Sequence, residues 1–194
     1  MMYKVIIFDF FGVFCAPMAT NWFKKAVPEH EANMPAFQAL CTQSDLGKLS
    51  RNDFNQEVSK MTGIATSEIV RGIETEMIVD NLLVDYAQKL KGLGFRLACL
   101  SNGSHEWTLQ VINEHGLGHL FEEVILSSDL GIVKPGSEIY LEALRKLNVQ
   151  PEDAFFVDDR KANVDAAEAL GIRSVVFTDT PVFVNDFEEM TKEG

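Results

Sequence analysis

The sequence predicts an α/β fold, in which a parallel β-sheet carries helices on both faces and a small all-helical segment is inserted after the first strand. Five short runs rich in β-branched and aromatic residues lie along the chain, at 4–8, 96–100, 123–126, 154–157 and 174–177. Helix-period stretches separate the last four runs, which is typical of a doubly wound parallel sheet. The 194 residues suit one domain, or one domain that carries an insertion.

Composition and charge argue against several classes of protein. The chain is 46% hydrophobic and has 17 basic against 29 acidic residues, a formal net charge of -12. This charge disfavours nucleic acid or an anionic membrane as a partner. The three cysteines have neither disulfide nor zinc-ligand spacing, so we expect reduced thiols. We also expect a cytoplasmic protein, either a monomer or a homodimer.

The first strand contains an acidic residue where the chain otherwise builds a core. The segment YKVIIFDFFGVF, residues 3–14, is almost wholly apolar, with Asp9 near its middle. A secretory signal does not tolerate a carboxylate there, and the run is too short for a membrane helix. A buried strand of a parallel sheet, whose carboxyl end delivers Asp9 to a crevice, explains both features.

The stretch after this strand reads as helices. Phe54, Val58 and Met61 share one face behind Ser50, and Asp53 completes an imperfect capping box. We therefore expect a core formed by residues 1–15 and 80–194, and a helical cap formed by residues 16–79 that lies over the end of the first strand. Four cap aromatics fit the cap's own core better than a pocket, namely Trp22, Phe23, Phe37 and Phe54.

The later helices carry recognisable ends. Ser104 is placed to cap a helix through Trp107 and Val111, which Gly116 ends, and Gly171 closes a helix that runs through Val164. These helices lie between the later strands, as a parallel sheet requires.

Polar residues follow the strands where ligands bind in an open parallel sheet, beyond the carboxyl ends. They are Asp9, the Ser101-Asn102-Gly103 turn, Lys134 and the Asp158-Asp159 pair. Each has an ordinary explanation as a turn, a cap or a solvated charge, but together they are poorly explained in that way. Clustered carboxylates imply a compensating cation.

The residue types in this cluster favour magnesium and a phosphate. Asp9 and Asp159 offer the hard oxygen ligands that Mg²⁺ prefers, together with water and a substrate phosphate. Lys134 adds a positive charge, and Ser101 with nearby backbone N–H groups can hold phosphate oxygens. We therefore expect a site built to receive a small phosphorylated metabolite.

The ordered set VIIFDFFGVF, LACLSNG, GIVKPGSEIY and FFVDDRKANVDAAEALGI resembles the four motifs of the haloacid dehalogenase-like hydrolase superfamily. The resemblance runs through the chain outside the insertion. It implies a Rossmann-like core with a helical cap of the C1 type, and it is nearest to the branch of sugar phosphatases, epoxide hydrolase phosphatase domains and haloacid dehalogenases.

The resemblance also implies roles for individual residues. Asp9 matches the nucleophile, which forms an aspartyl-phosphate, and Ser101 with Asn102 matches the phosphoryl-binding position. Lys134 matches the lysine that balances negative charge. The remaining matches concern Mg²⁺, with Asp159 and Asp9 as ligands, the backbone carbonyl of Phe11 as another, Asp158 as an auxiliary ligand and Asn163 as a supporting residue.

One position departs from the pattern. Most phosphatases of the superfamily carry a second Asp two residues after the nucleophile, and here that position is Phe11. A phenyl ring cannot move a proton, and general acid–base catalysis is typically worth about 10² to 10⁴ in rate. Either a cap carboxylate such as Glu29, Asp45 or Asp53 supplies the proton, or the leaving group needs little protonation.

Three hypotheses follow, and the sequence favours them in this order. The first is a working Mg²⁺-dependent phosphatase. The second is a catalytically impaired protein that binds a phosphometabolite or a partner. The third is a 2-haloacid dehalogenase, since those enzymes also have an aromatic residue at the position of Phe11, but they lack the acidic pair seen at Asp158 and Asp159.

Overall fold

A five-stranded parallel sheet forms the centre of residues 3–192, the part of the chain that the computed structural model describes. The strand order is β3-β2-β1-β4-β5, with β1 in the middle and every pair parallel. The predicted α/β fold with a doubly wound, Rossmann-like sheet is therefore confirmed. The strands are β1 (Val5–Phe8), β2 (Arg96–Ser101), β3 (Glu123–Leu126), β4 (Ala154–Asp158) and β5 (Arg173–Val176).

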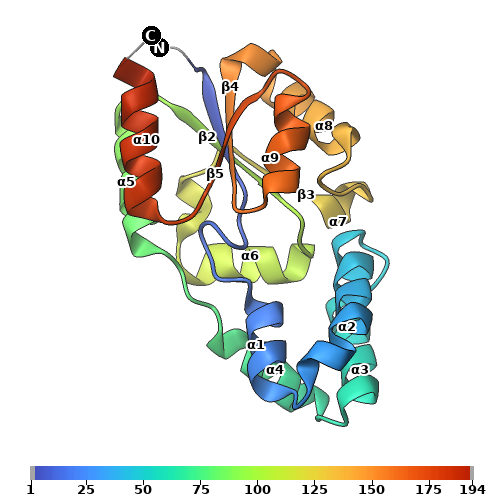
Figure 1. Ribbon diagram of the computed structural model, residues 1–194. Helices are drawn as coiled ribbons and strands as arrows, with labels where there is room; N and C mark the ends of the chain where they lie inside the picture. The colour runs from blue at the N-terminus through green and yellow to red at the C-terminus, as the bar shows by residue number, and fades with distance from the viewer. Residues whose placement is uncertain (1–2, 193–194) are drawn as a thin grey trace.

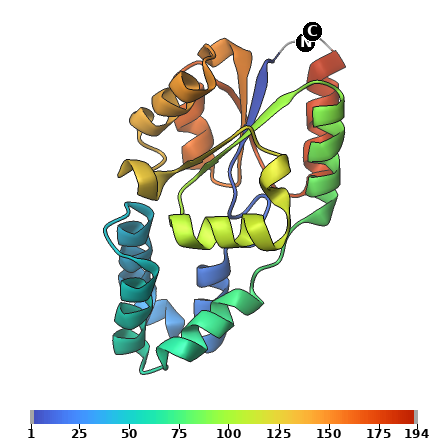
Figure 2. The same cartoon turned by 180° about the vertical axis from the view of Figure 1, so that it is seen from behind.

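Helices cover both faces of this sheet (Figures 1 and 2). The two faces bury alternate residues of the same strands: Ile6 and Phe8 belong to one apolar cluster, and Val5 and Ile7 to the other. Period-two alternation between two buried faces explains why these strands read as continuous apolar runs. The helices after the insertion are α5 (Asn81–Gly92), α6 (His105–Glu114), α7 (Ser127–Leu130), α8 (Ser137–Leu147), α9 (Lys161–Glu168) and α10 (Thr180–Lys192), with 3₁₀ turns η1 (Leu117–His119) and η2 (Pro151–Asp153).

The two faces use different helices. Leu83 and Tyr86 of α5, together with Phe183 and Phe187 of α10, pack into the cluster that contains Phe8. On the other face, residues of α8 and α9 pack against the cluster that contains Ile7. Within residues 3–192, no helix is long and apolar enough to cross a bilayer.

Four helices lie between β1 and α5 and extend beyond one end of the sheet (Figure 1). We call them the helical insertion: α1 (Met18–Ala26), α2 (His30–Asp45), α3 (Arg51–Thr62) and α4 (Thr66–Thr75). The chain leaves and re-enters side by side, since Cys15 pairs with Val79 in an antiparallel bridge. The helical content agrees with the expected cap, while the division into folding units at 1–15 plus 80–194 and at 16–79 stays a prediction.

The local signals at the helix starts are met in the structure. The Ser104 hydroxyl accepts a hydrogen bond from the Trp107 amide at the start of α6, and Ser50 accepts one from the Asp53 amide at the start of α3. The aromatic residues of the insertion pack as a group, with the rings of Phe23 and Phe37 stacked at a centroid distance of 4.0 Å.

Candidate functional site

The carboxyl ends of three neighbouring strands meet at one place. Phe8 of β1 pairs with Cys99 of β2 and with Val157 of β4, so the next residue along β1, Asp9, is level with the ends of both neighbours. Asp158 is the last residue of β4 and Ser101 the last of β2. The register therefore gathers residues that are about 60 to 150 positions apart in the sequence, as expected at such a strand end.

Lys134 is the buried centre of this group. Its ammonium nitrogen lies 2.8 Å from Asp9 Oδ1 and 2.7 Å from Asp158 Oδ2, and it donates to the carbonyl of Leu100 at 2.7 Å. Burial alone would lower the pKa of Lys134, but the charges of Asp9 and Asp158 outweigh it and raise the pKa. Since an ammonium has three donors, this lysine is charged and fully engaged.

Asp158 and Asn102 fix the position of the lysine. Asp158 accepts hydrogen bonds from the Asn163 amide group at 2.9 and 3.0 Å and from the backbone N–H of Arg160 at 2.9 Å. The Asn102 side chain bridges the Lys134 backbone, donating to its carbonyl and accepting from its N–H, both at 2.8 Å. The carboxylate oxygens of Asp158 thus make most of their hydrogen bonds to groups of the protein.

Asp9 uses one carboxylate oxygen for its contacts with the protein, and the residue lines a cavity. Both Lys134 and the backbone N–H of Phe10 contact Oδ1, and no residue in the described range 3–192 donates a hydrogen bond to Oδ2. Burial raises the pKa of Asp9 to about 7; the Lys134 charge lowers it and the Asp158 charge raises it. A carboxylate held in this way is desolvated on one side and open on the other.

Asp159 lies at the mouth of the site, and its exposed carboxyl group has a pKa that burial and the charge of Asp158 raise. Gly12 has a φ of +100°, and a Cβ there would lie 2.5 Å from the Asp159 carboxyl group. Only a glycine leaves room for this approach. Asp9, Asp158 and Asp159 each have a carboxylate oxygen within 4.8 Å of one from the other two. These oxygens are hard ligands and their negative charges repel one another, so the group fits a divalent cation.

Ser101 contributes a buried hydroxyl group without a partner. Its side chain is fully buried, and its Oγ has no hydrogen bond within residues 3–192. Buried polar groups are rarely left unsatisfied. This hydroxyl group is therefore a candidate hydrogen-bond donor to an oxygen atom of a ligand.

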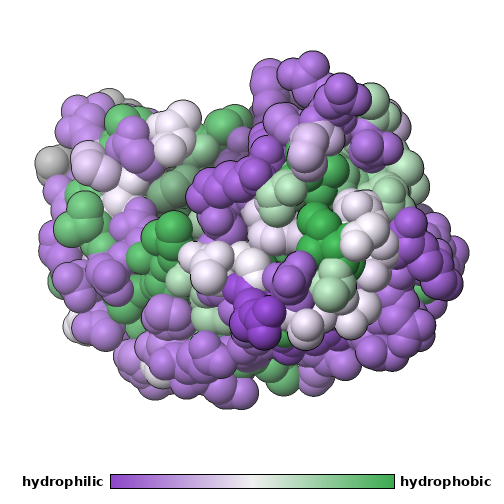
Figure 3. Space-filling view, turned by 90° about the horizontal axis from the view of Figure 1, so that it is seen from below, coloured by the Kyte–Doolittle hydropathy of each residue, from purple (hydrophilic) through white to green (hydrophobic). Residues whose placement is uncertain are grey.

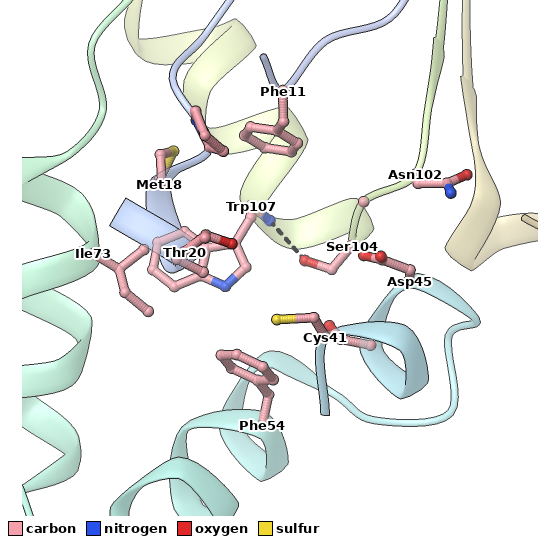
Figure 4. A pocket seen from close by; sticks show the side chains of 14 residues that line it. Phe11, Met18, Thr20, Cys41, Asp45, Phe54, Ile73, Asn102, Ser104 and Trp107 are labelled. Carbon is pink, nitrogen blue, oxygen red and sulfur yellow. Dashed lines mark hydrogen bonds between the residues drawn. The ribbon is translucent and has the colours of Figure 1, made fainter. Parts of the chain in front are cut away.

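Two adjoining cavities, which share several lining residues, lie between the sheet and the helical insertion. A polar cavity of about 500 Å³ is lined by Asp9, Asn102, Asp159 and Asn163 of the strand ends. A smaller apolar cavity of about 150 Å³ is lined by Phe54, Ile73 and Trp107, among others (Figure 4). Seen from the insertion side, the outer surface is largely hydrophilic, with smaller hydrophobic patches (Figure 3).

The structure also shows what the sequence left open. It brings Asp9, Asp158 and Asn163 together around Lys134, with Ser101 at the end of the neighbouring strand. The polar cavity is lined by Asp9, Asn102, Asp159 and Asn163, whereas Ser101, Lys134 and Asp158 are buried and line neither cavity. Phe11 lines both cavities, so its ring adds an apolar wall where a second acid was expected. Arg160 lines the polar cavity as well, and its place directly after Asp159 was a signal that we did not use.

Several curated proteins of known name are similar to this chain in sequence. The chain is 36% identical to the glyceraldehyde 3-phosphate phosphatase of Methanopyrus kandleri over 72 residues, which are 37% of this chain and 31% of that protein. It is 26% identical to the sesquiterpene phosphatase astK of Aspergillus oryzae over 71% of this chain and 72% of that one. It is also 30% identical to an (S)-2-haloacid dehalogenase of Pseudomonas putida over 45% of this chain and 38% of that protein. The first and third matches thus span less than half of those relatives.

A solved structure and a family model extend the match to most of the chain. One similar solved structure is that of the HAD family enzyme BT-2542 of Bacteroides thetaiotaomicron in complex with magnesium and inorganic phosphate. Its TM-score is 0.75 at 19% identity, and the match covers 91% of this chain and 94% of that one. At this identity, the likeness concerns the fold. The model of haloacid dehalogenase-like hydrolases matches residues 3–171, and the chain therefore belongs to the haloacid dehalogenase-like hydrolase family.

Proposed function

We propose that this hydrolase is a Mg²⁺-dependent phosphatase that acts on a small phosphorylated metabolite through an aspartyl-phosphate on Asp9. The observation that carries the proposal is the pairing of Asp9 Oδ1 with Lys134 at the edge of the polar cavity, which Asp9 lines. A carboxylate nucleophile beside a fixed positive charge suits attack on a phosphorus atom. The phosphatases among the relatives, and the neighbour with magnesium and phosphate, support the same reaction class.

Magnesium fits the residues at this site. Asp9, Asp159 and the backbone carbonyl of Phe11 would hold the ion, with Asp158 beside them as an auxiliary group. When bound, Mg²⁺ would neutralise negative charge on the carboxylates and on the phosphate, which makes approach of the dianion to Asp9 favourable. Burial raises the pKa of both Asp9 and Asp159, and the charge of Asp158 raises it further. A bound cation would relieve that repulsion between carboxylates.

The chain's own residues then bind and orient the phosphoryl group. The Ser101 hydroxyl group and Asn102 hold its oxygens, and Lys134 offsets the charge that gathers between nucleophile and phosphate. Asp9 attacks the phosphorus as the bond to the leaving oxygen breaks, and water later releases phosphate from Asp9. Asn163 supports this step indirectly, because it binds Asp158, which positions Lys134.

Phe11 gives weight to a second function, that of a binding protein with impaired turnover. Without an acid at this position, the site would still hold phosphate and metal but would release product slowly. Dehalogenation is the less favoured alternative, because three carboxylates gather at the site and would repel a carboxylate substrate.

The test is phosphate release from aryl, acyl and sugar phosphates, with Mg²⁺ and with EDTA. Parent protein should turn over only with Mg²⁺, and Asp9→Asn should abolish turnover. Asp85→Asn, which removes an exposed carboxylate of α5, should change nothing. Activity that survives in Asp9→Asn would refute the nucleophile, silence of the parent would favour the binding protein, and EDTA-resistant halide release from 2-chloropropionate would favour the dehalogenase.

A further inference from the structure

The missing acid raises the question of which carboxyl group of the insertion can reach the leaving group. Glu29 precedes α2 and is exposed, and it lies at the opposite end of this 16-residue helix from Asp45, a helix length of roughly 24 Å. Asp53 is used locally, since it accepts a hydrogen bond from the Ser50 hydroxyl at 2.7 Å. Asp45, the last residue of α2, remains.

Asp45 lies where the two cavities meet. Its carboxyl group lies at the sheet end of α2, opposite Asn102 and Ser104 (Figure 4). It lines both the polar cavity and the apolar cavity, and no residue in the described part of the chain makes a hydrogen bond to its carboxyl oxygens. The residues common to both linings are Phe11, Pro17, Thr20, Cys41, Asp45 and Asn102.

The boundary between the cavities is the place for a leaving-group oxygen. A phosphoryl group bound by the strand ends occupies the polar side, and the organic part of the ester extends into the apolar side. The bridging oxygen lies between them. Among the six shared lining residues, Asp45 supplies the carboxyl group, and Cys41, the other residue that titrates, has a pKa that burial and the charge of Asp45 raise to about 12.

The backbone of Asp45 is tied to the core rather than left to the insertion. The Ser127 hydroxyl donates to the Asp45 carbonyl at 2.6 Å, and the Gly103 amide donates to Ser127 at 3.1 Å. Gly47, two residues on, has a φ of +68°, and a Cβ there would overlap the Ser128 carbonyl oxygen. The end of α2 is therefore seated closely against the loops that hold the phosphate site, which is the rigidity that proton transfer requires.

Stability alone does not explain an acidic residue here. A negative charge at a helix C-terminus opposes the helix dipole and is therefore unfavourable. Burial raises the pKa of Asp45 to about 6, and the charges of Arg160 and Lys134 lower it. The other acidic groups that face the same polar cavity are Asp9 and Asp159.

We infer that Asp45 is the proton donor and acceptor of this site, in the place that Phe11 leaves vacant; the inference rests on the proposed function. As Asp9 Oδ2 bonds to phosphorus, the bond from phosphorus to the ester oxygen breaks, and the Asp45 proton goes to that oxygen, which leaves as an alcohol. Water then attacks phosphorus, gives its proton to the Asp45 carboxylate, and the bond to Asp9 breaks. Phosphate is released and both carboxyl groups return to their starting states.

The test is a comparison of two esters with apolar leaving groups of different quality, in single-turnover experiments with Mg²⁺. For benzyl phosphate, a poor leaving group, Asp45→Asn should slow phosphorylation of Asp9 by about 10² to 10⁴. For 4-nitrophenyl phosphate, which needs little protonation, the variant should keep the burst of nitrophenolate and lose only steady-state rate. Glu31→Gln, which neutralises an exposed carboxylate of the same helix, should behave as the parent.

Two further readouts separate catalysis from a structural role. Phe11→Asp in the Asp45→Asn background should restore turnover of benzyl phosphate. In the parent, kcat/KM for this ester should fall as pH rises through the ionisation of Asp45, and the variant should lose that dependence. An equal fall for both esters, with no rescue, would overturn the inference while leaving Asp9-dependent turnover intact. A parent protein without Asp9-dependent turnover would overturn the proposed function and this inference together.

Discussion

Replacement of Lys134 by Met should destabilise the fold as well as abolish activity. The ammonium group is fully buried and contacts Asp9, Asp158 and the Leu100 carbonyl at 2.7 to 2.8 Å. Asp158 keeps the Asn163 amide as a donor, whereas Asp9 keeps only a backbone N–H. Removing one partner of a buried ion pair costs about 3–5 kcal/mol, and we expect this loss of unfolding free energy above pH 7.

The loss should depend on pH in a defined direction. Lys134 lowers the pKa of Asp9, which burial has raised from 3.8 to about 7, so its removal raises that pKa further. The folded state then holds a proton that the unfolded state releases, and stability falls as pH rises from 3.8 through the folded pKa. The deficit of Lys134→Met should therefore be largest in alkaline buffer and should shrink on acidification.

Urea unfolding in EDTA, followed by circular dichroism across this pH range, measures both effects. The matched control is Lys161→Met, which removes an exposed lysine that pairs with Asp165 at 2.6 Å, and it should leave stability nearly unchanged because exposed ion pairs contribute little. A Lys134→Met protein as stable as the control, or a deficit that grows on acidification, would refute the interpretation of the buried network.

Three further predictions concern the metal and the contact between insertion and core. Gly12→Ala places a Cβ 2.5 Å from the Asp159 carboxyl group, so the Mg²⁺ affinity measured by calorimetry should fall about 10- to 100-fold; unchanged affinity would exclude Asp159 as a ligand. Mg²⁺ at about 100 times its Kd should add about 2.7 kcal/mol to the unfolding free energy, and EDTA should reverse this gain. Arg51→Ala removes an ion pair to Glu74 and a guanidinium that lies 3.5 Å from the ring centre of Trp107. Urea unfolding should therefore show that the free energy of unfolding falls by about 1–2 kcal/mol. An unchanged free energy would mean that these contacts are not maintained in solution.

The strands were predictable because their residues are apolar on both faces. The run at 123–126 matches β3, and the runs at 96–100 and 154–157 each fall one residue short, because Ser101 and Asp158 belong to β2 and β4 although they carry polar side chains. The last run was placed one residue late, since β5 begins at Arg173. Arg173 is exposed on this edge strand, where apolar content is a weaker guide.

The site was predictable as a set of residues rather than as a set of contacts. Order along the chain placed Asp9, Ser101 and Asp158 at strand ends and Lys134 in the segment that follows the third strand. Parallel strands bring those ends together. Sequence order did not show that Lys134 and Asn163 both donate hydrogen bonds to the Asp158 carboxylate. Those contacts depend on side-chain packing between segments distant in sequence.

The choice among the acidic residues of the insertion could not be made from the sequence for the same reason. Asp45 is distinguished by where the end of α2 docks, and Ser127, 82 residues away, fixes that position. Its one local signal was an acidic residue at a helix C-terminus, which is disfavoured there. The structure adds the cavity boundary that gives this residue its significance.

The most direct measurement is detection of the phosphorylated nucleophile. Parent protein would be mixed with 4-nitrophenyl phosphate and Mg²⁺, quenched rapidly in acid, digested and examined by mass spectrometry. We expect one phosphoryl group on the peptide that contains Asp9, formed within the first turnover and absent from Asp9→Asn. Phosphate release that proceeds without this species, or that persists in Asp9→Asn, would contradict covalent catalysis by Asp9.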